Sequence, residues 1–159
     1  MKLNIIAVGK LKEKYLKDGI AEYSKRLSKF CDLNIIEVPD EQAPESLSAA
    51  QELQVKKKEA ERVFKHIKEG STLVVLDVKG DKFSSEEFAA KLRNFFVSGS
   101  SNITFVIGGS LGLDKELVKA ANLRFSLSDL TFPHQLTRLI LLEQLFRAFK
   151  IINGEPYHK

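Results

Sequence analysis

Short apolar runs separated by longer amphipathic stretches dominate this sequence. Runs rich in β-branched and aromatic residues predict strands buried on both faces, and the clearest are residues 72–77 (TLVVLD) and 103–107 (ITFVI). The same reasoning predicts further strands at Lys2–Val8, 34–38 and 124–127. These five runs are the candidate strands of a single sheet.

Amphipathic stretches between the strands predict helices. In residues 11–30 the apolar positions Leu16, Ile20 and Leu27 fall on one stripe, which is the helical period. The expected helices are 11–30, Ser46 or Ser48 to about 69, Ser84 to about 97, 114–122 and 134 to about 152. Strand and helix therefore alternate, which predicts an α/β fold with a parallel sheet flanked by helices on both sides.

The last of these helices carries more apolar residues than one face can use. They are Leu136, Leu139, Ile140, Leu141, Leu142, Leu145, Phe146 and Phe149, and at 100° per residue they spread well beyond one stripe. One face is expected to pack on the sheet, and the surplus needs a second partner. The economical partner is another copy of the same chain, so the helix predicts a homodimer.

Length and composition indicate a single domain over residues 1–159 in a soluble globular protein. Apolar residues make up 43% of the chain and charged residues 29%. No apolar run approaches the roughly 20 residues of a membrane span, and the first residues lack the features of a signal peptide. The single cysteine, Cys31, excludes an internal disulfide. The expected location is the cytoplasm.

Charge is distributed unevenly along the first third of the chain. Residues 1–30 carry eight lysines and arginines against three acids, whereas residues 31–50 carry five acids and no base. A basic face attracts nucleic acid phosphates, but exposed lysines on a helix are also ordinary solvated surface. Charge leaves both interpretations open.

The strand at 103–107 runs directly into a glycine loop. Gly108, Gly109 and Gly112 follow it, and Asp114 occupies the position of a helix N-cap. Such a strand–loop–helix unit lets backbone approach a ligand closely, although the glycines also suit a tight turn without a ligand. The spacing does not match the dinucleotide fingerprint, and the chain has no P-loop motif.

Two other chemistries have little support in the sequence. Residues 108–112 match the nucleophile elbow pattern G-x-S-x-G, but Asp129 and His134 follow only five positions apart in an irregular segment. His66 and His158 are likewise far from any second ligand at metal-binding spacing. We therefore expect neither a serine hydrolase nor a metal site.

Three blocks of the sequence together resemble a known family. FVIGGSLGLD, then LSDLTFPHQLTRLILLEQLFRA, then the closing PYHK are similar to the RlmH family of SPOUT methyltransferases, as are the opening KLNIIAVGK and GIAEYSKRL. The resemblance covers essentially the whole chain. It implies S-adenosylmethionine as cofactor and methylation of N3 of a pseudouridine in 23S ribosomal RNA, within the assembled ribosome.

The resemblance also implies a particular form of the α/β fold. SPOUT domains end in a deep trefoil knot, an exception to the usual absence of knots in proteins. They are homodimers that bind the cofactor in the knot at the subunit interface. The apolar surplus of the last helix agrees with this expectation.

The family's cofactor-binding positions fall on three loops of this sequence. The resemblance assigns them to Leu76, Gly108, Gly109, Leu127, Ser128, Asp129, Leu130, Thr131 and Phe132. Backbone groups and aliphatic walls suit a compact cation with a flat apolar base. Without the resemblance, core packing is the favoured interpretation of Leu127, Leu130 and Phe132.

Four residues near the end of the chain are the candidate catalytic residues. Arg138 follows His134 by one helical turn, where it suits a phosphate or the uracil anion formed as N3 loses its proton. Tyr157 and His158 are expected to reach from the partner subunit, to stack on the flipped base or take its proton. Which group is the base stays open.

A second class of function is compatible with the same pattern. A non-catalytic α/β module that binds a nucleotide or RNA through the glycine loop also needs a strand, a glycine turn and a helix. Binding of S-adenosylmethionine separates the two classes.

Overall fold

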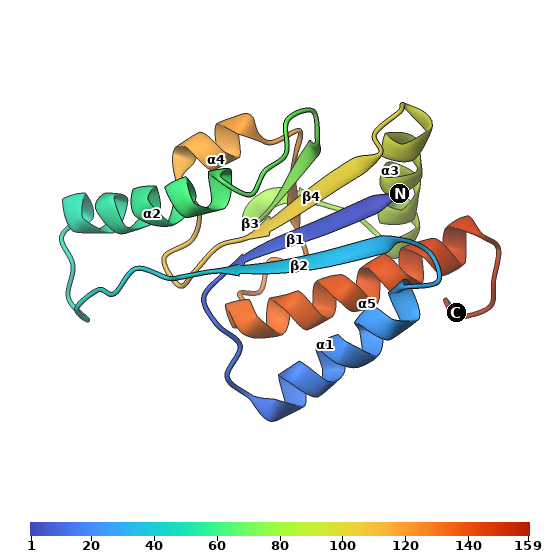
Figure 1. Ribbon diagram of the computed structural model, residues 1–159, viewed down its shortest axis with the longest axis horizontal. Helices are drawn as coiled ribbons and strands as arrows, with labels where there is room; N and C mark the ends of the chain where they lie inside the picture. Colours follow the sequence, from blue (N-terminus) through green and yellow to red (C-terminus); the bar gives the residue numbers. More distant parts are fainter.

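The computed structural model describes residues 1–159, in which strands and helices alternate along the whole chain (Figure 1). The strands are β1 (Lys2–Val8), β2 (Asp32–Val38), β3 (Thr72–Lys82), β4 (Asn102–Ile107) and β5 (Leu123–Ser126). The helices are α1 (Lys14–Leu27), α2 (Ala49–Phe64), α3 (Ser85–Val97), α4 (Lys115–Ala120) and α5 (His134–Ile152). Every element expected from the sequence is present, with shifted ends.

The five strands form one parallel sheet in the order β2-β1-β4-β3-β5. β1 lies inside it, and its Ile5 pairs with Ile35 of β2 on one side and Phe105 of β4 on the other. β-Branched and aromatic side chains are favoured in such a doubly covered strand. The predicted parallel sheet is therefore confirmed.

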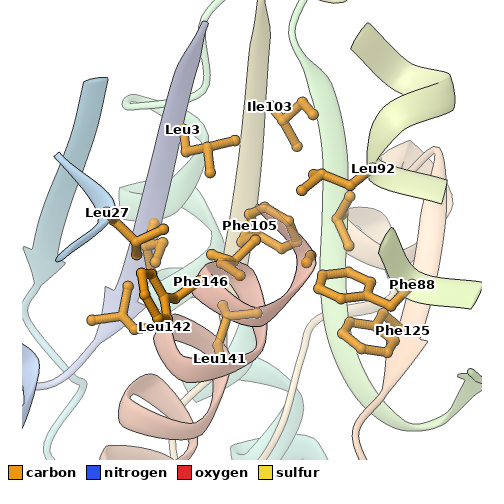
Figure 2. Close-up of a cluster of buried hydrophobic side chains, with 14 of the residues drawn as sticks. Leu3, Leu27, Phe88, Leu92, Ile103, Phe105, Phe125, Leu141, Leu142 and Phe146 are labelled. Atoms are coloured by element: carbon orange, nitrogen blue, oxygen red, sulfur yellow. The ribbon is translucent and has the colours of Figure 1, made fainter. Parts of the chain in front are cut away.

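Helices cover both faces of the sheet and form two hydrophobic cores. Along β1, Leu3 and Ile5 belong to the core under α1, α3 and α5, whereas Ile6 and Val8 belong to the core under α2 and α4. This alternation follows from the two-residue period of a strand. Figure 2 shows the larger core, where Phe105 of β4 lies between side chains of α5, such as Leu141, and Phe88 of α3.

Serine and aspartate caps define where several helices begin. Ser48 and Ser84 each form a capping box with the residue three positions later, Gln51 and Glu87 respectively. Asp114 accepts a hydrogen bond from the backbone N–H of Glu116. These polar residues fix the starts of α2, α3 and α4.

Two predicted helices are shorter in the structure than in the sequence pattern. The helix expected over 11–30 begins only at Lys14, because residues 9–13 form a loop whose backbone bonds to other elements. The helix expected to reach about residue 69 ends at Phe64, and a turn leads to Gly70, which has a φ of 76°. Periodicity alone did not mark these ends.

β3 is longer than predicted, because its second half also pairs with the edge strand β5. Leu76 and Asp81 both pair with Phe125, so the intervening residues form an irregularity in β3. A Cβ at Gly80 would lie 2.7 Å from the backbone carbonyl of Arg124, which only glycine tolerates. The extended part of β3 continues past the end of β4, and its residues Asp77–Lys79 form one wall of a cavity there.

α5 packs against both α1 and α3 in the middle of one layer. Leu141, Leu142 and Leu145 are fully buried by the chain itself, whereas Leu136 and Ile140 stay half-buried. The apolar surplus expected from the sequence therefore reduces to the N-terminal half of α5. None of the helices combines the length and apolar character needed to cross a bilayer.

Candidate functional site

A cavity of about 660 Å³ opens at the carboxyl ends of β3, β4 and β5. Loops at this edge of a parallel sheet are where open α/β folds bind ligands, and the volume suits a cofactor-sized molecule. Its walls come from three loops and the first turn of α5. The residues on which the argument depends are Leu76, Asp77, Gly108, Gly109, Leu127, Ser128, Leu130, Thr131, Phe132 and His134.

The glycine loop after β4 forms a wall made of backbone. Gly112 donates a hydrogen bond to the carbonyl of Gly109 at 3.0 Å, which closes a tight turn. A Cβ at Gly108 would lie 3.0 Å from the carbonyl oxygen of Gly112, and one at Gly109 would lie 3.2 Å from Glu59 Oε1. Side chains are therefore excluded here, and a ligand meets peptide groups directly.

The loop from Leu127 to Phe132 forms the opposite wall. Ser126 Oγ donates to the carbonyl of Ser128 at 2.9 Å, and Ser128 Oγ accepts from the backbone N–H of Leu130 at 3.0 Å. Side-chain hydrogen bonds of this kind hold a short irregular segment in one conformation. Leu130 keeps 69% of its surface exposed beside the cavity, so the wall presents an uncovered aliphatic group.

One predicted cofactor residue points elsewhere. Asp129 does not line the cavity, and its carboxylate accepts a hydrogen bond from Lys82 Nζ at 2.5 Å. Lys82 ends the extended β3, so this exposed ion pair links the Leu127–Phe132 loop to the opposite strand. The other eight predicted cofactor positions all line the cavity.

Asp77 lines the cavity where the pairing of β3 becomes irregular. It was not predicted as a site residue from the sequence. Its Oδ2 accepts from Arg124 Nη2 at 2.7 Å, and its Oδ1 accepts from the backbone N–H of Lys79 at 3.0 Å. Burial acts to raise the pKa of Asp77, but these two donors outweigh it and hold the pKa below its usual value. An anionic oxygen with remaining lone pairs therefore faces the cavity.

His134 lines the cavity from the first turn of α5. Burial and the positive charges of Arg138 and Lys12 lower its pKa, against the opposing charge of Asp40. Its imidazole is therefore neutral at neutral pH and has a nitrogen lone pair free to accept a proton. Of the four candidate catalytic residues, His134 alone lines the cavity.

Arg138 is buried, and its exposed fraction is 2%. Its Nη1 donates to Glu37 Oε2 at 2.6 Å, and its Nη2 donates to the carbonyl of Gly9 at 2.7 Å and, more weakly, to that of Val8 at 3.3 Å. The guanidinium thus joins α5 to the carboxyl ends of β1 and β2. It does not line the cavity, and its terminal nitrogens are occupied by protein groups.

Tyr157 and His158 lie at the other end of α5. The phenol of Tyr157 donates to Glu143 Oε1 at 3.1 Å, and His158 Nε2 lies 2.7 Å from Glu86 Oε1. Because α5 has 19 residues, its two ends are about 28 Å apart. Within one chain, the structure does not bring these two residues to His134.

Arg147 connects Tyr157 and His158, and the sequence did not predict it as a site residue. It bonds to Glu143 one turn earlier on α5, its Nη1 lies 3.1 Å from His158 Nδ1, and its guanidinium lies over the Tyr157 ring. Burial, the hydrogen bond shared with Tyr23 and the hydrogen bond that Tyr157 donates to Glu143 raise the pKa of Tyr157 far above its usual value. The Glu143–Arg147 spacing of four positions was the available signal for this cluster.

Comparison with known proteins assigns the family. Residues 1–158 match a family model described as "Predicted SPOUT methyltransferase". The chain belongs to the SPOUT methyltransferase family. It is 70% identical over 159 residues to a protein of Acetivibrio thermocellus named Ribosomal RNA large subunit methyltransferase H, and 62% identical to one of the same name from Ruminiclostridium cellulolyticum; both matches cover the whole of each chain.

A solved structure shows the same fold at much lower identity. A probable methylase family protein of Haemophilus influenzae superposes with a TM-score of 0.52 at 13% identity, covering 99% of this chain and 70% of that one. The resemblance to SPOUT methyltransferases expected from the sequence is thus confirmed. No group of three or more histidine, cysteine, aspartate or glutamate side chains is arranged to hold a metal in this SPOUT chain.

Proposed function

We propose that this protein is an S-adenosylmethionine-dependent methyltransferase that methylates N3 of a pseudouridine in 23S ribosomal RNA on the assembled ribosome. The observation that carries the proposal is a cofactor-sized cavity formed by the expected loops, in a chain 70% identical over its full length to a large-subunit ribosomal RNA methyltransferase. A ribosomal substrate also implies action in the cytoplasm.

The cavity fits this cofactor in size and chemistry. At Gly108 and Gly109 a Cβ would press on Gly112 and Glu59, so the loop keeps its tight turn and offers peptide groups to a ligand. Leu76, Leu127 and Phe132 supply apolar walls for a flat base. Backbone groups of the two loops and the anionic Asp77 offer hydrogen bonds to polar parts of the ligand. When bound, the cofactor supplies a methyl group on a positively charged sulfur.

The trefoil knot belongs to the same proposal. Residues 127–133 lead from the edge strand β5 to α5, which packs between α1 and α3 in the middle of the layer. The chain therefore runs from the edge of the sheet back to the middle of the helix layer, and on the way it passes near the connection between β3 and α3. Passage of this segment through that connection would knot the chain and fix the cavity loops against one another.

A homodimer would complete the site. Leu136 and Ile140 lie one turn apart on α5 and stay half-buried, which leaves an apolar strip for a second subunit. If the two α5 helices run antiparallel, the tail of each subunit lies near the N-terminal end of the other. The partner subunit's Tyr157 and His158 would then face His134 across the interface.

In this arrangement the protein residues have distinct tasks. The target N3 must lose a proton, and neutral His134 at the cavity or the partner's His158 can accept it. Tyr157 keeps its proton because its pKa is raised, so it stacks or donates a hydrogen bond. Buried Arg138 acts as a positioning residue, because its guanidinium holds the loop beside His134 in place.

One experiment tests the proposal directly. Ribosomes from cells lacking this gene are incubated with the purified protein and S-adenosylmethionine, and their 23S RNA is mapped by mass spectrometry. We expect one additional methyl group on one pseudouridine, together with calorimetric binding of the cofactor. Binding of a nucleotide or RNA without methyl transfer would instead support a non-catalytic module.

A further inference from the structure

The loop between β1 and α1 passes beside the first turn of α5 (Figure 1), and that turn carries the cavity-lining His134. At Gly9 a Cβ would lie 3.8 Å from His134 Nε2, so the loop begins in contact with the candidate base. Residues 10–17 read KLKEKYLK, with four lysines against one glutamate. Through Gly9 and Lys12 this basic segment adjoins the first turn of α5, which carries His134.

The backbone of this loop is fixed by hydrogen bonds to other elements. Leu11 N–H donates to Glu37 Oε2 at 2.8 Å, and Lys12 N–H donates to Gln135 Oε1 at 3.2 Å. Arg138 holds the same Glu37 and also the carbonyl of Gly9. A loop tied at three successive points presents its side chains from a rigid base.

The side chains of the loop are free for a partner. Lys10 and Lys12 are exposed and form no ion pair, whereas the next lysine, Lys14, is bonded to Asp18 at 2.7 Å. Tyr15 leaves 68% of its surface exposed, although a tyrosine ring normally finds cover. Two unpaired cations and an uncovered ring therefore lie within six positions of one another, on the segment that adjoins the first turn of α5.

We propose that Lys10, Lys12 and Tyr15 form an RNA-contacting surface that holds the nucleotides flanking the target base. The inference rests on the proposed function, because it assumes an RNA substrate at the cavity. Lysines contact phosphates, and an exposed aromatic ring stacks on an unpaired base; these are the two recurring elements of single-strand RNA recognition. The surface supplies recognition in a chain with no separate RNA-binding domain.

A second basic area fits this role less well. A hollow between the C-terminal ends of α1 and α5 is lined by four cations, Lys25, Arg26, Lys29 and Lys150, of which Arg26 and Lys150 are paired with Glu22 and Glu155. Within one chain this hollow lies at the end of α5 opposite to His134. Half of its cations are already paired within the chain, whereas Lys10 and Lys12 are unpaired and follow Gly9 beside His134, so the β1–α1 loop is the better surface for RNA.

The test compares two double variants that remove the same charge. Lys10→Gln with Lys12→Gln alters the loop, and Lys57→Gln with Lys65→Gln alters exposed lysines on and beyond α2, on the other face of the sheet. We expect the first pair to lower kcat/KM for ribosomes roughly tenfold at moderate salt and to reduce its salt dependence by about two phosphate contacts. The second pair should leave kcat/KM and its salt dependence unchanged.

Tyr15 supplies an independent arm of the test. Tyr15→Phe keeps the ring and should retain activity, whereas Tyr15→Ala should raise the KM for ribosomes by roughly tenfold. Calorimetric binding of S-adenosylmethionine should stay unchanged in all these variants, which shows that the fold and cavity are intact.

Two results would overturn the inference in different ways. If the parent protein methylates ribosomes and both lysine pairs behave alike, the RNA surface lies elsewhere while the proposed function stands. If the parent protein transfers no methyl group to ribosomes, the proposed function falls and this inference falls with it.

Discussion

Arg138 of α5 and Glu37 of β2 are joined at 2.6 Å across 101 positions of the chain. The pair lies where β1 and β2 end, and both residues also bond to backbone groups of the β1–α1 loop. Burial acts to raise the pKa of Glu37, but the Leu11 N–H and the Arg138 guanidinium outweigh it and lower that pKa. One ion pair thus connects the sheet, the loop and the helix that carries His134.

Removal of the buried guanidinium should destabilise the protein. Arg138→Met leaves the carbonyls of Gly9 and Val8 without their donor, and we expect the free energy of unfolding to fall by about 2–3 kcal/mol. Arg93→Met, at an exposed position of α3, should change it by less than about 0.5 kcal/mol. Urea denaturation measures both, and equal effects would contradict the anchoring role.

Gly80 should resist substitution for a steric reason. In Gly80→Ala the new Cβ would lie 2.7 Å from the backbone of Arg124, so β3 and β5 must separate at a cost of about 2–3 kcal/mol. Gly99→Ala meets no atom within 4 Å and should cost only its left-handed backbone, about 1 kcal/mol. Because β3 and β5 wall the cavity, calorimetry should show weaker cofactor binding for Gly80→Ala alone.

The pH dependence of methyl transfer should report on His134. Its pKa is lowered from 6.5, so the neutral form persists somewhat below that pH and is lost only as the pH falls through the lowered value. If His134 is the base, single-turnover rates should fall only as the pH drops through this lowered pKa, at a more acidic pH than an unperturbed imidazole would give, and His134→Ala should abolish most activity. His66→Ala, at an exposed position, serves as the control. If the single-turnover rate of His134→Ala shows the same pH dependence as the parent protein, His134 is not the base and His158 is the remaining histidine candidate.

Mixing two inactive variants tests whether the site is shared between subunits. His134→Ala and His158→Ala each damage one side of the proposed interface site, so a heterodimer of the two keeps one intact site. We expect random mixing to restore about one quarter of the parent activity, since about half of the dimers are mixed. Each variant alone should stay inactive. Failure to recover activity, with mixed dimers present, would place both histidines in one subunit's site.

Local signals predicted the elements well. The apolar runs predicted the strands, because β-branched and aromatic residues such as those at 103–107 favour a strand that is covered on both faces. Ser84 predicted the start of α3 through its capping box. The glycine loop was found because Gly108 and Gly109 follow a buried strand directly. These features depend on neighbours in sequence.

Features that depend on distant neighbours were missed. The extension of β3 needs β5 alongside it, and the burial of Arg138 needs Glu37, 101 positions away. A charged residue in a helix was therefore expected at a surface, where it could contact substrate. Asp77 was overlooked because its partner, Arg124, lies on another strand.

The strand order has a consequence for how the chain is made. β1 leaves the ribosome about one hundred residues ahead of its inner neighbour β4, with Leu3 paired to Ile103. At a synthesis rate of roughly 5–20 residues per second, the N-terminal strand waits about 5–20 s for that neighbour. During this delay the edge of β1 that will pair with β4 is open, so newly made chains can pair with one another through it until β4 arrives.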